Sequence, residues 1–169
     1  STLNANGATV VFLADSQPTI VTEAKPVGAN NVSAKKGIGA SIAASKLTNT
    51  TQTRVGEFSA LNGAASLSLD ASATDNVETK STVGAEGGSA ITPGSATAVV
   101  DSNVFAFLDA GDRLSVAGDV RLNTAHGGSV VSTVAGGVLA EQAAIGGSFA
   151  MNDVDVDSHA LILRSLSAE

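Results

Sequence analysis

Three aspartates alternate with apolar residues near the end of the chain, at Asp153, Asp155 and Asp157. If this segment is a β-strand, the three carboxylates share one face and lie about 6.5–7 Å apart along it. Ca²⁺ takes six to eight oxygen ligands, so the aspartates are the one candidate for a metal site. The calcium-loop pattern Asp-x-[Asp/Asn]-x-[Asp/Asn]-Gly is absent, because Ser158 stands where glycine is required. The favoured interpretation is therefore a solvated acidic face that discourages association, with Ca²⁺ as the alternative.

The only two histidines are His126 and His159. Neither belongs to a His-x-x-x-His pattern, and there is no cysteine that could complete a metal site. A catalytic histidine needs a positioned nucleophile and an orienting acid, and nothing in the spacing provides either. We predict no catalytic role for them.

Two glycine-rich stretches, residues 84–88 and 136–137, are not phosphate-binding loops. No Gly-Lys-Ser/Thr follows either stretch, and no strand–loop–helix unit surrounds them. We interpret them as corners where the chain turns. The sequence therefore predicts no catalytic residue, no cofactor-binding residue and no enzyme.

The composition limits the fold and the partners. The 169 residues suffice for one domain, and 43 % of them are hydrophobic while 15 % are charged. There are five phenylalanines and no tryptophan or tyrosine, which indicates a thin core of small and β-branched side chains. The net charge of −7 disfavours nucleic-acid binding, and no apolar run is long enough for a membrane helix.

Internal repetition is the strongest organising signal. Three segments align without gaps, beginning at Gly39, Gly94 and Gly146, so their starts are 55 and then 52 residues apart. Each opens with glycine and small residues, and each has alanine at its fifth position. The segment 67–71 (LSLDA) also resembles the segment 114–118 (LSVAG). The sequence therefore predicts a diverged repeat of about fifty residues.

Alternation of period two predicts strands within each repeat. Leu67 and Leu69 alternate with serine and aspartate, and Val154 and Val156 alternate with the three aspartates. Continuous apolar runs such as residues 10–13 and 161–163 are typical of strands that are covered on both faces. Only residues 138–144 could form a helical turn or two.

Short strands with small inward residues are typical of a parallel β-helix, or β-solenoid, in which successive coils stack about 4.8 Å apart. Coils of about twenty residues would give about eight coils in this chain. The alternative fold is a β-sandwich, although the two-residue hairpin turns that it would contain are few. The fold class is in either case all-β.

The cadence of residues 37–56 (GIGASIAASKLTNTTQTRVG) and 67–90 resembles the repeats of large secreted bacterial adhesins, the leukotoxin-like and filamentous-haemagglutinin-like passengers of autotransporter and two-partner secretion systems. The resemblance covers residues 37–163. It implies a right-handed β-helix, an extracellular or cell-surface location, and a host receptor or glycan as partner.

We expect one domain, residues 1–169, with a repeat region at about 32–163 and flanking or capping segments at 1–31 and 164–169. The predicted function is a structural or adhesive stalk segment that contacts neighbouring repeats end to end. Two alternatives remain open: a self-assembling fibre, sheath or shell subunit, and an enzyme that acts on polysaccharide. We predict no insertion into membranes.

Overall fold

The computed structural model describes residues 1–26 and 35–167, and they form an all-β structure. No helix occurs in this part of the chain, and residues 138–144, where a helical turn was considered, are extended. The strands are β1 (Thr2–Asn4), β2 (Thr9–Ser16), β3 (Thr19–Ala24), β4 (Lys36–Ile38), β5 (Ser41–Val55), β6 (Ala60–Asn62), β7 (Ser66–Leu108), β8 (Leu114–Ser115), β9 (Val120–Ile162) and β10 (Leu166–Ser167).

All strand pairs among the described residues are parallel, so this part of the chain lacks the antiparallel hairpins of a β-sandwich. Strands β2 to β5 pair in order along β7, and β7 pairs along its length with β9. Paired residues such as Ser41 and Gly94 are 53 positions apart, whereas Val10 and Leu67 are 57 apart. The pairing thus agrees with the predicted period of about fifty residues.

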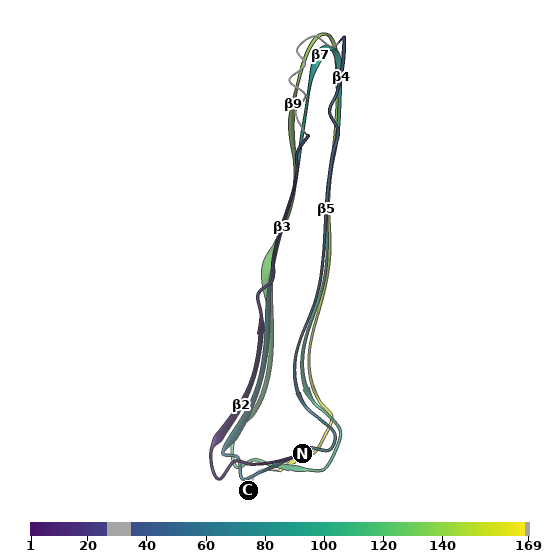
Figure 1. Ribbon diagram of the computed structural model, residues 1–169. Helices are drawn as coiled ribbons and strands as arrows, with labels where there is room; N and C mark the ends of the chain where they lie inside the picture. The colour runs from purple at the N-terminus through teal and green to yellow at the C-terminus, as the bar shows by residue number, and fades with distance from the viewer. Residues whose placement is uncertain (27–34, 168–169) are drawn as a thin grey trace.

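The chain forms long, narrow loops (Figure 1). It runs away from the base along an outgoing arm, turns at the far end near β4, and comes back along a return arm. We call one such circuit a pass, so that the first pass holds β2 to β5, the second holds β7 and the third holds β9. The first residues of the chain lie at the base, and so do the short strands β1, β6, β8 and β10.

Two sequence predictions about this arrangement are wrong. The main strands are not short, because β7 and β9 each extend over 43 residues. A pass also needs more than fifty residues rather than about twenty, so the chain makes three passes and not eight. The reason is that segments rich in serine and threonine continue as extended backbone, and their inward hydroxyl groups form hydrogen bonds between the two arms.

The predicted alignment of the repeats is close but shifted. Gly94 pairs with Ser41 and Ser148, so the alignment on Gly39 and Gly146 is off by two residues in each case. Residues 67–71 pair with 120–124 and not with 114–118. A shift of two keeps every side chain on its face of the sheet, so the alternation of small residues could not reveal the error.

Side chains on the inner face of β7 are mostly buried, as the alternation predicts, and side chains on its outer face are not. Leu67 and Leu69 are buried and the residues beside them are partly exposed. In the run 10–13, however, Val11 and Leu13 are exposed, so the prediction that both faces of this strand are covered is wrong. Each arm is a single layer that faces the other arm on its inner side, and its outer side faces solvent.

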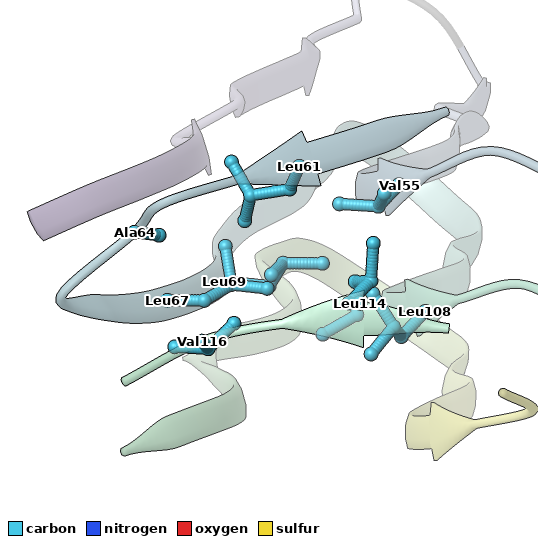
Figure 2. Close-up of a cluster of buried hydrophobic side chains, with 9 residues drawn as sticks. Val55, Leu61, Ala64, Leu67, Leu69, Leu108, Leu114 and Val116 are labelled. Atoms are coloured by element: carbon cyan, nitrogen blue, oxygen red, sulfur yellow. The ribbon is translucent and has the colours of Figure 1, made fainter. Parts of the chain in front are cut away.

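The largest apolar cluster lies at the base (Figure 2). Leucines and valines from the ends of the arms and from the base strands point toward one another there. Its buried members are Val55, Leu61, Ala64, Leu67, Leu69, Ala106, Leu108, Leu114 and Val116. Two smaller clusters lie further along the arms, around Val77 and Val100 and around Ala71 and Val104.

Glycines allow close contact between the two arms at the far end. A Cβ atom on Gly39 would lie 1.8 Å from the carbonyl oxygen of Gly84, and one on Gly37 would lie 2.2 Å from that of Glu86. Real side chains cannot approach backbone so closely. Gly37 pairs laterally with Ala90, so its contact with Glu86 is with the opposite arm, and both glycines are therefore required where the two arms approach each other near the turn.

Candidate functional site

A polar cluster lies between the two arms, about half-way along them. The carboxylate of Asp75, on β7, is 1 % exposed. It accepts a hydrogen bond of 2.8 Å from the Asn49 side chain on β5, and Nε2 of His126 on β9 lies 2.8 Å from its other oxygen. Each of the three residues occupies an inward position of a different pass, so the cluster connects all three passes.

The environment of Asp75 favours the ionised carboxylate. Burial alone would raise its pKa, but Ser102, His126 and Asn49 together outweigh that effect, and the pKa of Asp75 lies below its ordinary value. The Ser102 hydroxyl is close enough to favour the charge, although its geometry is not that of a full hydrogen bond. A buried charge with these partners is stable where an isolated one would not be.

This cluster has two members of a catalytic triad but no nucleophile. Asp75 orients the His126 ring through Nε2, and within the described residues no hydroxyl group is hydrogen-bonded to the other ring nitrogen. The interior position also leaves no room for a substrate, since Asp75 and Ser102 are fully buried. The arrangement can cross-link the arms, but it lacks what acyl transfer requires.

Hydroxyl groups provide further links between the arms towards the far end. Thr79 donates to Ser45, which donates to Thr22, at 2.7 and 2.8 Å. Ser81 donates to the carbonyl oxygen of Ser41, and the Ser41 hydroxyl donates to that of Ala24. These hydrogen bonds allow small polar residues to occupy inward positions that a larger core would fill with apolar side chains.

The three candidate calcium ligands lie on the outer face of the return arm. Asp153, Asp155 and Asp157 are exposed, and Asp155 pairs with Asp101 of the neighbouring pass. Asp157 contacts His159 at 2.6 Å, and the His159 ring is parallel to that of Phe105 with centroids 6.0 Å apart. In the part of the chain that the structure describes, no three Asp, Glu, His or Cys side chains are grouped so as to hold a metal ion.

Arg164 forms a second buried polar centre, at the base. Its guanidinium group donates to the carbonyl oxygens of Asp109, Ser59 and Gly56, and it is 7 % exposed. The Asp109 side chain in turn accepts a hydrogen bond from Arg54. Arg164 thereby joins the end of the third pass to the segments that follow the first and second passes.

Sequence reasoning missed both Asp75 and Arg164. The alternation that starts at Leu67 and Leu69 places residue 75 on the inward face, so a charged residue at an inward position was a usable signal. Arg164 had no such signal, because it was assigned to a flanking segment. Residues 9–24, which were also left to a flanking segment, form β2 and β3 and pair with β7 in the main sheet.

Comparisons with known proteins place the chain in no family. No family model, no curated protein and no solved structure matches it. Within residues 1–26 and 35–167, no helix is long and apolar enough to cross a membrane.

Proposed function

We propose that this chain is a non-catalytic structural segment of a β-helical shaft in a secreted bacterial surface protein. The observation that carries the proposal is the stacking of equivalent inward residues from successive passes. Phe12, Leu69 and Leu122 are paired across the three passes of the outgoing arm, and Leu47, Val100 and Val154 are paired across the return arm.

Rows of equivalent residues are typical of a shaft, because each pass has an edge and an inner face on which a further pass of the same kind can pack. The architecture then extends along one axis by the addition of passes, and its stability grows with contacts between neighbours. Its polar interior is used for contacts between the arms, as the cluster around Asp75 illustrates. The secreted location, the right-handed coil and an adhesive contact with a host receptor or glycan rest on the resemblance to bacterial adhesins.

Solution X-ray scattering of the dilute chain tests the shaft geometry. About half of the 43 residues of β7 lie in each arm, which at about 3.3 Å per residue gives a length of roughly 70 Å. Two sheets about 10 Å apart and three passes about 4.8 Å apart then give a radius of gyration of about 21 Å. A compact globular chain of this length would have about 15 Å. The lower value would contradict the proposal.

The enzymatic alternative makes a different prediction. If the chain cleaved polysaccharide, the buried Asp75 and its neighbour His126 would be the residues to test, since together they form the one carboxylate–imidazole pair in the described interior. We expect no release of reducing sugar from acidic or neutral polysaccharides. Cleavage by the purified chain that is lost in Asp75→Asn, with the β-structure retained, would overturn the non-catalytic assignment.

A further inference from the structure

The return arm of β9 has an inner face that nothing in the described structure covers. Val100 is 1 % exposed in the second pass, but Val154, its partner in the third pass, is 49 % exposed. Leu108 and its partner Ile162 differ in the same way, at 0 % and 45 %. The third pass thus has the side chains of a covered strand in an uncovered position.

The backbone of the same segment has a free edge. The Leu163 amide donates to the Leu108 carbonyl oxygen, so in this part of β9 the odd-numbered residues bond to β7. Because successive residues of a strand direct their amide and carbonyl groups to opposite sides, the even-numbered residues, Val154 among them, direct theirs away from β7. The Val55 carbonyl oxygen of β5 accepts a hydrogen bond from the Asp109 amide, so the odd-numbered residues of β5 bond to the second pass. The even-numbered residues of β5 therefore direct their amide and carbonyl groups to the other edge of the sheet, the edge formed by the first pass.

We propose that the free edge of β9 binds the β2–β5 edge of a second copy of this chain, head to tail, in the register that continues the passes. The inference deepens the proposed shaft and rests on it. In this register Val154 faces Leu47 of the second copy, and its free backbone groups meet those of Lys46 and Thr48 of the second copy. Inward residues stay inward, so Val154 and Ile162 become covered.

The outer faces of the two edges are complementary in charge. Lys46 and Asp153 belong to one row, in which Val99 separates them within a single chain. Both side chains are exposed. In the head-to-tail register, Lys46 of the second copy lies directly beside Asp153 of the first. The interface therefore forms an ion pair between Lys46 and Asp153 that a single chain cannot form.

The outer faces also match in their apolar residues. Ile38, Ile91 and Ile145 form a row of three isoleucines across the passes, and all three are exposed. Docking places Ile38 of the second copy beside Ile145, and Ile42 of the second copy beside Phe149. A surface row of isoleucines that is extended by a second copy loses apolar area to water at both edges.

Docking requires one exchange at the base. The base strands lie in the order β1, β6, β8 and β10, so β1 is at the N-terminal end of this row and β10 is at the C-terminal end. In the continued register, β10 of the first copy takes the place of β1 of the second copy. β1 has three exposed residues, and beside it lies a hollow of about 270 Å³ lined by Leu3, Phe12 and Leu61. The free energy lost when β1 is displaced is thus small compared with the free energy gained from strand pairing along β9.

The experiment is sedimentation velocity on the full chain at increasing concentration. Because a head-to-tail contact does not close on itself, we expect the mass to increase from the 16.5 kDa monomer to a series of oligomers without a fixed size. A monomer at every concentration up to about 1 mM, with unchanged circular dichroism, would overturn the proposal. The dilute scattering profile would still report the shaft geometry, so the two failures are distinguishable.

A charge exchange tests the register. Lys46→Asp and Asp153→Lys should each weaken association about threefold to tenfold, since each places like charges together at the junction. An equimolar mixture of the two variants should recover the association of the unmodified chain, because every mixed junction again pairs Lys with Asp. If the mixture associates no better than either variant alone, this register is wrong.

Two further variants test the free edge of β9 and the replacement of β1 by β10 of the other copy. Val154→Pro removes a free edge amide without breaking a bond to β7, and it should reduce association at least tenfold while the monomer keeps its β-structure. Leu3→Ser weakens only the hold of β1, so it should strengthen association. A Val154→Pro chain that associates normally, or a Leu3→Ser chain that associates less, would contradict the proposed contact.

Discussion

Leu69 offers the most direct test of which face of each strand is inward. Its side chain is 0 % exposed, lies in the apolar cluster at the base and is flanked by Phe12 and Leu122 of the adjacent passes. Leu69→Ala removes a fully buried isobutyl group and leaves a cavity between two passes that cannot easily collapse. Such replacements cost about 2–5 kcal/mol, and the tight flanking favours about 3–4 kcal/mol.

The matched control is the same substitution at Leu13. This residue pairs with Asp70, next to Leu69, but it lies on the outer face and is 71 % exposed. We expect Leu13→Ala to change the free energy of unfolding by less than about 0.5 kcal/mol. For a chain of this size, the Leu69 variant should melt roughly 10 °C lower, measured by circular dichroism.

The comparison of the two variants also tests the register. If Leu13→Ala cost as much as Leu69→Ala, Leu13 would be inward as well, and β2 would have to be shifted by one residue relative to β7. A cost below about 1 kcal/mol for Leu69→Ala would refute the close packing between passes. Urea denaturation of both variants gives the free energies from which to decide.

Three other predictions concern the buried polar groups and the far end. The pKa of Asp75 in the folded protein lies below its ordinary value of 3.8, so its contribution to stability is present above that pH and is lost as the pH falls through the lower folded-state pKa. Thermal melts between about pH 5 and 2 should show this loss, and the loss should be smaller in Asp75→Asn. Gly39→Ala should cost more than about 2 kcal/mol in urea denaturation, because its Cβ would overlap the Gly84 carbonyl oxygen. A neutral effect would mean that the two arms are further apart near the turn. Arg164→Met should lower the free energy of unfolding by about 2–4 kcal/mol, because it leaves buried carbonyl groups without hydrogen-bond donors. Arg121→Met, at an exposed position, is the control and should lower it little. Equal melting temperatures for the two variants would refute the role of Arg164.

The sequence allowed the all-β class, the parallel pairing of the strands and the period to be predicted, because side-chain alternation and repetition are local signals. Leu67 and Leu69 illustrate this, since their alternation with the polar Ser66, Ser68 and Asp70 identifies the inward face without any structure. The candidate site was predicted much less well. Asp153, Asp155 and Asp157 drew attention because they are adjacent in sequence, whereas Asn49, Asp75 and His126 are brought together only by the stacking of the passes.

The sequence by itself determined that this protein forms β-strands with a thin core of small residues, repeated at intervals of about fifty residues. Only the tertiary structure decided how long a pass is, which residues pair, and where the chain leaves an edge uncovered. The physical reason is that alternation fixes the face of a side chain but not the register, since a shift of two residues preserves every face. The register is fixed by close contacts between the arms, such as Gly39 against Gly84, and by the hydrogen bonds of Asp75 and Arg164.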